Sequence, residues 1–505
     1  MDFELEQNII HCYENVGQAS VCQEETQESI VPDACPDILR IIDVCAQAFP
    51  SRCEMGDGQA TVIGMIQANI LYMPETGALL QSIPLRIPFS VRMDVPGTNS
   101  DAIPEMTARI CHADARVLNP RKLLFRCDLL AEVTALRRHE HATYSTVLHP
   151  EQGNICQRQQ QFECERLSSV PQRIFPISEE IRLTGAHPPL LLAARAHSRC
   201  SESRIIGTKL IFKGKTDVEL LLQTPEGDME RKVESFPFSQ ILEVKGAGEN
   251  GNCQVQLELC EFSCVQPLDD PFHLMVEGEL LAMGQVRETE HLHILTDVYS
   301  TTHQCHPEHH EITLYAPSHQ TIIPQTFRDL LETEDVVRTV CDCRFLTGHV
   351  LCSPDENSLT LTANGCISVL YLDEDRHPRI MEKQMELSAR CSTSPASDIL
   401  RLTLHPGELY ATPCAGGIEV RLSGEFVLTT ADPIPINTIC HASLGDPRGN
   451  NHLRPSVTLR RPEQGETLWD IAKSCGTTCE AIVQANEFAG EELPAGKLLL
   501  IPGSR

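Results

Sequence analysis

Internal repetition is the feature that most constrains the fold of this chain of 505 residues. A glycine opens three similar phrases, "GMIQANILY" at 64–72, "GKTDVELLL" at 214–222 and "GCISVLY" at 365–371. These glycines are 150 and 151 residues apart (214 − 64 and 365 − 214). The phrases "IPFSVRMDVPG" at 87–97 and "FPFSQILEVKG" at 236–246 keep the same register in the first two copies. The sequence therefore predicts three copies of one module.

Within each copy, apolar residues alternate with polar or small ones, as in "KTDVELLLQT" and "GIEVRLSGEFVL". This period of two is typical of half-buried antiparallel strands, because successive side chains point to opposite faces of a sheet. The sequence therefore predicts a mainly β chain with three repeated antiparallel β-sandwich-like modules. We expect them at 1–147, which includes an N-terminal segment, at 165–300 and at 318–440.

One helix is predicted in the first copy, within "VPDACPDILRIIDVCAQAF". Asp37 is placed to cap it, because aspartate is favoured just before the first helical turn. Ile38, Ile41, Ile42 and Cys45 then recur at helical spacing on one face. We therefore expect a short helix that begins after Asp37.

A small unit ends the sequence. The polar segment 441–456 is rich in Gly, Pro and Asn and predicts a linker. In the unit that follows, 457–505, "VTLRR" and "KLLLIP" predict short strands. Between them, Thr467 and Asp470 form a capping box before an apolar stripe, and Thr478 is placed to cap a second helix. The expected order is strand, helix, helix, strand, a small α+β (βααβ) domain.

This unit resembles a LysM domain. The residues that match the family's pattern are Gly465, Thr467, Leu468, Ile471, Ala472, Asn486, Pro494, Gly496, Ile501 and Pro502. Glu466 replaces the usual aspartate. The resemblance implies binding of N-acetylglucosamine-containing glycans, as in peptidoglycan, in a groove between the loop before the first helix and the loop after the second. The partner- or glycan-binding residues expected on this basis are Gly465, Glu466, Thr467, Leu468, Trp469, Asn486, Glu487 and Phe488.

Trp469 is the only tryptophan of the chain and the residue that we expect to anchor an interface. It lies about 100° around the helix from Leu468, on the shoulder of the apolar stripe. Large aromatic residues at such positions dominate binding hot spots. The competing interpretation is a packed core residue, because so small a domain needs each of its large side chains.

The first copy resembles the SPOCS module of endospore formers. The resemblance rests on "VPDACPDILRII" at 31–42, "IPFS" at 87–90 and "LNPRKLLFRCDLLAEV" at 118–133. The second copy departs from the Asn-x-Arg-Lys turn at 268–270, and the third lacks the Pro-Phe-Ser phrase. SPOCS modules followed by a LysM domain resemble the SipL-type coat-assembly family. This implies a morphogenetic protein of the spore coat or envelope in the mother cell cytoplasm. Its LysM domain would dock onto the coat-basement ATPase or another spore coat protein at the forespore surface.

Charge and composition narrow the partners and the compartment. Forty-one basic residues against seventy acidic ones give a net charge of −29, which would repel a phosphate backbone, so nucleic acid is excluded. The start of the sequence lacks the features of a secretory signal, and no apolar run predicts a membrane span. Twenty-three cysteines without a Cys-x-x-Cys pair indicate reduced thiols rather than a disulfide framework. A cytoplasmic location is expected; export by another route would favour the alternative, a peptidoglycan-binding cell-wall protein.

No catalytic signature occurs, so we expect no enzyme, no catalytic residues, no metal and no cofactor. A hydrolase with a LysM targeting tail would need a constellation across the repeats that the sequence does not display. "GAGENG" at 246–251 resembles a dinucleotide fingerprint, but the strand-like segment after it favours a hairpin loop. "HQCHPEHH" at 303–310 offers thiolate and imidazole donors without a second ligand pair at fixed spacing. We expect it to be an exposed connection between the second and third modules.

Overall fold

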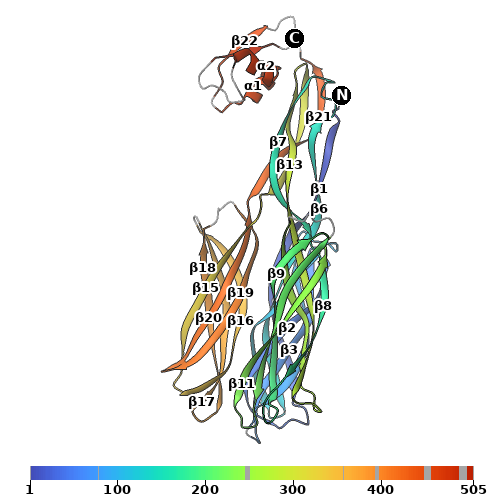
Figure 1. Ribbon diagram of the computed structural model, residues 1–505. Coiled ribbons are helices and arrows are strands. Elements are labelled where there is room, and N and C mark those ends of the chain that lie inside the picture. The colour runs from blue at the N-terminus through green and yellow to red at the C-terminus, as the bar shows by residue number, and fades with distance from the viewer. Residues whose placement is uncertain are drawn as a thin grey trace.

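The computed structural model describes residues 2–77, 79–244, 251–355, 358–392, 397–448, 456–463, 465–487 and 498–503. Apart from two short helices in the terminal unit, the elements of this part of the chain are strands, which confirms the mainly β prediction (Figure 1). The loop that contains "GAGENG" lies almost wholly outside the described residues.

Each copy folds into the same pair of three-stranded antiparallel sheets. In the first module these are β1 (Leu5–Ile30), β6 (Lys122–Val147) and β5 (Ile103–Asn119), and β2 (Ile38–Gly56), β3 (Gln59–Pro74) and β4 (Gln81–Asp94). In the second they are β8 (Gln172–Arg182), β13 (His273–Ser300) and β12 (Asn252–Val265), and β9 (Leu190–Ile206), β10 (Lys209–Gln223) and β11 (Met229–Glu243). In the third they are β15 (His319–Glu332), β20 (Gly417–Ala431) and β19 (Asp398–Cys414), and β16 (Val337–Asp355), β17 (Ser358–Asp373) and β18 (Pro378–Cys391). The chain thus contains three repeated sandwich-like modules.

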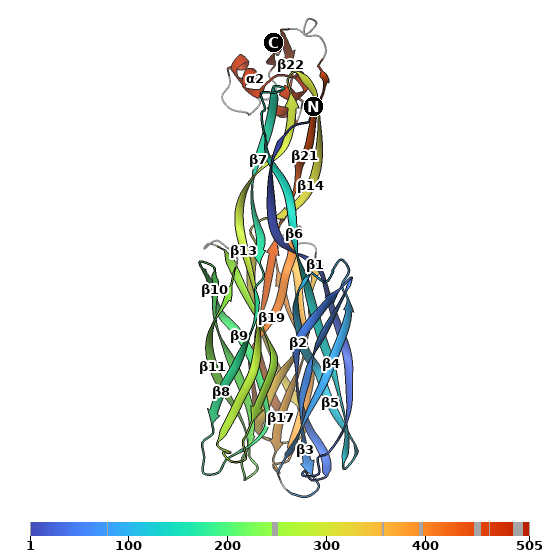
Figure 2. The same ribbon diagram turned by 90° about the vertical axis from the view of Figure 1, so that its right-hand side faces the viewer.

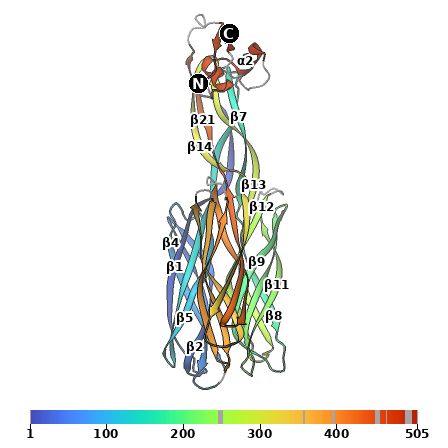
Figure 3. The same cartoon turned by 90° about the vertical axis from the view of Figure 1, so that its left-hand side faces the viewer.

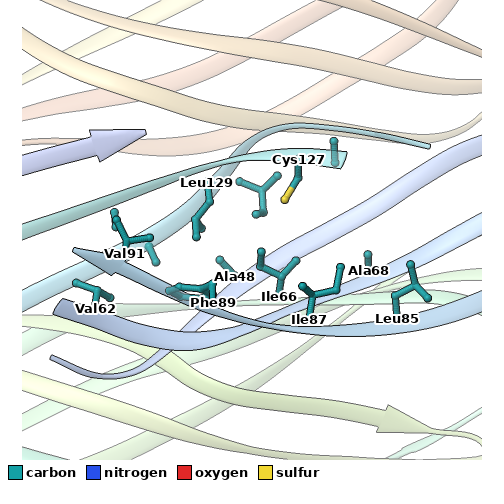
Figure 4. Close-up of a cluster of buried hydrophobic side chains, with 14 of the residues drawn as sticks. Ala48, Val62, Ile66, Ala68, Leu85, Ile87, Phe89, Val91, Cys127 and Leu129 are labelled. Carbon is teal, nitrogen blue, oxygen red and sulfur yellow. The ribbon is translucent and has the colours of Figure 1, made fainter. Parts of the chain in front are cut away.

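An apolar core fills the space between the two sheets of a module, as Figure 4 shows for the first one. Ile66 and Val91 extend into this core from one sheet, and Cys127 and Leu129 from the other; all four are fully buried. Burial of such side chains is the main favourable term in folding. The alternation in the sequence therefore reports the inner faces of the sandwiches.

The repeat glycine lies on the middle strand of the second sheet in each module. Gly64 pairs with Phe89 on the neighbouring strand, and Gly214 pairs with Phe238. A Cβ atom on either glycine would lie 2.6 Å from the Cζ atom of its phenylalanine. The aromatic ring of the Pro-Phe-Ser phrase therefore covers the bare backbone of the glycine, and no side chain fits between them.

In the third module, the ring that covers the repeat glycine comes from the other neighbouring strand. Gly365 pairs with Met385 on β18, where the first two modules have phenylalanine. Phe345 of β16 covers the glycine instead, with its Cζ atom 2.4 Å from the position of a Cβ atom. This exchange explains how the third copy keeps its glycine without the Pro-Phe-Ser phrase.

The three modules pack side by side around a common axis (Figures 2 and 3). Leu71, Leu221 and Leu372 each lie seven positions after the repeat glycine (71 − 64, 221 − 214 and 372 − 365) and meet in one buried cluster. The same positions of the three copies therefore face one another. Beside this cluster, residues of all three modules line an axial cavity of about 2560 Å³.

Buried ion pairs join the modules at the axis. Arg344 of the third module donates to both carboxylate oxygens of Asp43 in the first, at 2.6 and 2.5 Å. Arg195 of the second module donates to both oxygens of Asp342 in the third, at 2.7 and 2.8 Å, and to Glu219 at 2.8 Å. Bidentate geometry makes such pairs strong and directional. The network therefore fixes how the modules sit against one another.

Beyond the modules, the strands continue into a stalk (Figure 1). The first half of β1 and the last part of β6 form one two-stranded ribbon. A second ribbon consists of β7 (Ile155–Ser169) and the end of β13, and a third of β14 (His303–Tyr315) and β21 (Pro433–Pro447). Apolar side chains from the three ribbons form a common core, among them Ile10, Ile294 and Ile312. Each copy thus supplies one two-stranded ribbon to the stalk.

The stalk corrects two expectations. The segment 303–310 is exposed at five of its eight positions, as expected, but it forms part of strand β14 rather than a loop between modules, and residues 441–447 of the predicted linker continue strand β21. Residues 449–455 of that linker lie outside the described residues. The outward face of a two-stranded ribbon is polar, so these strands lack the apolar alternation of the modules. The expected module starts at 165 and 318 accordingly omit most of β7 and all of β14.

The prediction of a helix after Asp37 is wrong, because strand β2 occupies Ile38–Gly56. Its pairing with β3 slips by one residue twice near the start, between Ile38 and Arg40 and between Ile41 and Asp43. Such bulges interrupt the period of two, so the apolar residues of this strand do not alternate regularly and several of them fall at helical spacing. The isoleucines themselves favour a strand, since β-branched side chains pack well on a pleated surface.

Candidate partner-binding site

The terminal unit has the predicted order β22 (Val457–Arg460), α1 (Leu468–Cys475), α2 (Cys479–Asn486) and β23 (Leu499–Pro502). The capping box is present: the hydroxyl of Thr467 accepts from the backbone N–H of Asp470 at 3.3 Å, and the Asp470 carboxylate accepts from the backbone N–H of Thr467 at 2.9 Å. Thr478 caps α2 in the same way, accepting from the N–H of Ala481 at 3.1 Å. Local sequence signals therefore determine both helix starts.

A residue of the stalk completes the core of this unit. Tyr299, near the end of β13, is 1% exposed and belongs to the same buried cluster as Leu468, Ile471 and Ile482. Its hydroxyl donates a hydrogen bond of 2.8 Å to the backbone carbonyl of Thr477 between the two helices. The small domain is thus packed against the stalk through a shared apolar core.

Trp469 anchors an interface inside the chain. Its indole Nε1 donates to Oδ2 of Asp297 on β13 at 2.7 Å, and its ring meets that of Tyr299 edge to face with centroids 4.8 Å apart. The ammonium group of Lys473, one turn further along α1, lies 2.7 Å from both carboxylate oxygens of Asp297. One face of α1 is therefore held at the tip of the stalk (Figure 1). An interface between Trp469 and another molecule remains a prediction.

The residues predicted in the loop before α1 shape that loop. Gly465 has a φ of 87°, a conformation that favours glycine, and is exposed. The carboxylate of Glu466 accepts from the guanidinium of Arg460 on β22 and from the backbone N–H of Glu463 at 3.1 Å. The hydroxyl of Thr467 is engaged in the capping box. Glutamate thus replaces the usual aspartate by reaching both the strand and the loop.

The residues predicted after α2 are also partly structural. The side-chain amide of Asn486 donates to the carbonyl of Leu500 at 2.6 Å and accepts from its N–H at 2.7 Å, which fastens α2 to β23. Leu468 is 2% exposed and belongs to the core. Glu487 ends α2 in the left-handed conformation and is exposed. Phe488 lies outside the described residues. Gly465, Thr467 and Glu487 are therefore the predicted residues that present exposed surface.

Two of the three sequence features of the SPOCS resemblance, the phrases at 31–42 and 118–133, meet at the end of the first module that lies away from the stalk. Arg121 donates to the carbonyls of Cys35 and Val31 at 2.7 and 3.0 Å and to the carboxylate of Asp37 at 3.0 Å. The side chain of Asn119 accepts from the backbone N–H of Arg121 at 3.0 Å and closes the turn. The Asn-x-Arg turn therefore clamps the Pro-Asp loop.

Comparison with protein families agrees with this architecture. The model of the SipL, SPOCS domain matches residues 37–118, which span β2 to β5 of the first module, and the model of the LysM domain matches residues 463–502. A search of curated proteins and of solved structures found no match. Within the described residues, no helix combines the length and the apolar character needed to cross a membrane. The chain is therefore a sporulation-related protein that carries a SPOCS domain in the first of its three modules and a LysM domain at the tip of its stalk.

Proposed function

We propose that this protein is a non-catalytic morphogenetic protein of the spore coat or envelope. It acts in the mother cell and docks through its LysM domain onto a coat-basement protein, such as the coat-basement ATPase, at the forespore surface. Both matched domains are binding domains rather than catalytic ones. The three modules offer further surfaces for contacts with other coat components.

One observation carries this proposal: the LysM domain sits at one end of an elongated molecule and the three modules at the other (Figures 1 and 2). Strand β14, which runs along the stalk, has 13 residues. At about 3.3 Å per residue the stalk is roughly 40 Å long. A partner bound to the LysM domain would therefore leave the modules accessible, as a connector between two layers requires.

The contacts of the LysM domain indicate where a partner would bind. The stalk covers one face of α1 through Trp469 and Lys473. The loop groups that remain exposed include Glu463, Gly465 and Glu487. We therefore assign docking to these loops, with Trp469 holding the domain in place.

Localisation of the full chain in sporulating cells tests the proposal. Deletion of 449–505 is expected to abolish recruitment to the forespore while the three modules remain folded, because each has its own apolar core. The double substitution Glu463→Arg and Glu487→Arg is expected to weaken recruitment in the intact chain. Thr458→Arg, at an exposed position of β22, is the matched control and should leave recruitment unchanged. A truncated chain that still localises would refute the docking role.

The LysM match itself favours one alternative, the binding of peptidoglycan glycans. Sedimentation with purified cell wall at physiological salt separates the two functions. Retention of the full chain, lost on deletion of 449–505, would favour the glycan. Substitution of Thr467 or Asn486 is a poor probe here, because both side chains hold the domain together.

A further inference from the structure

Three side chains with metal-binding groups converge where the stalk meets the modules. Cys12 and Glu14 lie on β1 and His141 on β6. The Sγ atom of Cys12 is 3.8 Å from Oε1 of Glu14, and Nε2 of His141 is 2.5 Å from the same oxygen. All three potential ligand atoms lie within 4.8 Å of one another. In the part of the chain that the structure describes, this is the only such group of three.

The strand register explains the convergence. Cys12 and Glu14 are two residues apart and therefore share one face of β1, as His139 and His141 share one face of β6. Cys12 pairs directly with His139 in the antiparallel ribbon and lies diagonal to His141, whose direct partner is Ile10, while the side chain of Glu14 reaches along the ribbon to the ring of His141. The rings of His139 and His141 lie with their centroids 4.5 Å apart. One face of the ribbon thus carries four donors.

This face of the ribbon borders the axial cavity, which Cys12, Glu14, His139 and His141 all line. A cavity of about 2560 Å³ has ample room for solvent, so an ion has a path to the ligands. The "HQCHPEHH" segment, by contrast, contributes to no such group among the described residues. The two alternating pairs, Cys-x-Glu and His-x-His, are the only signal of this site in the sequence.

We propose that Cys12, Glu14 and His141 bind a zinc ion, with water or His139 in the fourth position. Thiolate, imidazole and carboxylate are the three ligand types that zinc takes in proteins, in tetrahedral geometry. With zinc–ligand distances of about 2.0–2.3 Å, neighbouring ligand atoms lie roughly 3.3–3.8 Å apart. The Cys12–Glu14 separation of 3.8 Å already fits this geometry. The Glu14–His141 hydrogen bond opens as the ion takes the place of its proton.

Metal binding must also remove the proton of the thiol. Burial, with Glu14 nearby, raises the pKa of Cys12 to about 12, although Arg166 opposes this shift. The other groups that face the thiol are Cys164 on β7 and the two histidines on β6. Zinc therefore competes with a proton at Cys12, and its apparent affinity should rise with pH.

Cobalt titration of the full chain, stripped of metal with a chelator, tests the site. Coordination of Cys12 should produce a thiolate-to-cobalt absorption band that saturates at one equivalent and that zinc abolishes. Cys12→Ser should remove the band, and His141→Gln should weaken cobalt binding at least tenfold. The matched controls are Cys22→Ser on the same strand and His11→Gln, whose side chain points away from the cluster.

A second measurement needs no variant. Zinc should slow alkylation of Cys12 in the native chain at least tenfold, as mapped by mass spectrometry, while alkylation of the exposed Cys22 and Cys414 stays unchanged. An unchanged rate at Cys12, or a cobalt band of equal strength in Cys12→Ser, would overturn the proposal. The group would then be a Glu14–His141 hydrogen bond over a buried thiol. Neither measurement depends on the docking role of the LysM domain.

Discussion

The indole nitrogen of Trp469 donates a 2.7 Å hydrogen bond to Asp297, a residue 172 positions earlier in the chain. The same carboxylate receives the ammonium group of Lys473, so one aspartate on the stalk holds two side chains of α1. Because Trp469 is the only tryptophan, its fluorescence reports the docking of the LysM domain alone.

Asp297→Ala is expected to loosen the LysM domain from the stalk. Hydrogen bonds to charged groups contribute about 1.5–3 kcal/mol, and this change removes the acceptor of both Trp469 and Lys473. Tryptophan emission should shift to longer wavelength as the indole becomes hydrated. Thr296→Ala, at the neighbouring position, should leave the emission unchanged; an unshifted spectrum in Asp297→Ala would show that the apolar contacts alone hold the domain.

Tyr299→Phe and Tyr299→Ala should destabilise the docked domain to different degrees. The first leaves the buried carbonyl of Thr477 without its hydrogen bond, at a cost of about 1–3 kcal/mol. The second also leaves a cavity in the shared core, at about 3–5 kcal/mol. Urea unfolding followed by Trp469 fluorescence measures both. Equal midpoints for the two variants would contradict the central packing role of the ring.

Asp342→Asn should weaken the network of buried ion pairs between the modules, and it should do so most strongly at neutral pH. Burial would raise the pKa of Asp342, but the guanidinium groups of Arg195 and Arg344 outweigh it and hold the pKa below its usual value. A carboxylate with a lowered pKa stabilises the fold above about pH 3.9, its pKa in the unfolded chain, and loses this contribution as the pH falls through the folded pKa.

The expected cost of Asp342→Asn at neutral pH is about 3–5 kcal/mol, because Arg195 loses its buried partner. Unfolding midpoints in urea should converge with those of the native chain as the pH falls through the lowered pKa of Asp342 in the folded state. Asp375→Asn, an exposed substitution in the same module, should have no effect at any pH. A loss of stability that does not depend on pH would indicate a packing effect instead.

Gly214→Ala should destabilise the second module by about 1–3 kcal/mol, as overpacking does. The new Cβ atom would lie 2.4 Å from the backbone oxygen of Arg199 and 2.6 Å from Phe238, and the backbone oxygen cannot move aside cheaply. Gly424→Ala is the control, because its nearest neighbour is 3.5 Å away. Thermal unfolding followed by circular dichroism distinguishes the two, and equal melting temperatures would contradict the role of the glycine.

Features that rest on local chemistry could be predicted from the sequence. The capping residues Thr467 and Thr478 determine the helix starts of the LysM domain, and the repeat glycine marks the middle strand of each module. The strand that begins at Ile38 could not be recognised, because two bulges disturb its alternation.

Contacts between distant parts of the chain do not produce a recognisable pattern in the sequence. Asp297 is a single aspartate within an apolar stretch of β13, and nothing near it in the sequence indicates a tryptophan partner. The predicted binding residues Thr467 and Asn486 matched the family pattern, but that pattern also contains residues that maintain the fold. Sequence similarity alone cannot separate the two roles.

Equivalent positions of the three modules carry different residues where they meet at the common axis. Cys45, Arg195 and Asp342 occupy equivalent positions, since they pair with residues five places after the repeat glycine (69 − 64, 219 − 214 and 370 − 365). In a homotrimer of identical subunits, each such position would carry three copies of one side chain, and three arginines or three aspartates would repel one another. Covalent fusion of the subunits releases the axis from that symmetry, so a cation and an anion can share it. Because the repeats have diverged, this single polypeptide can form a trimer-like arrangement of modules in which the buried charges at the axis neutralise one another.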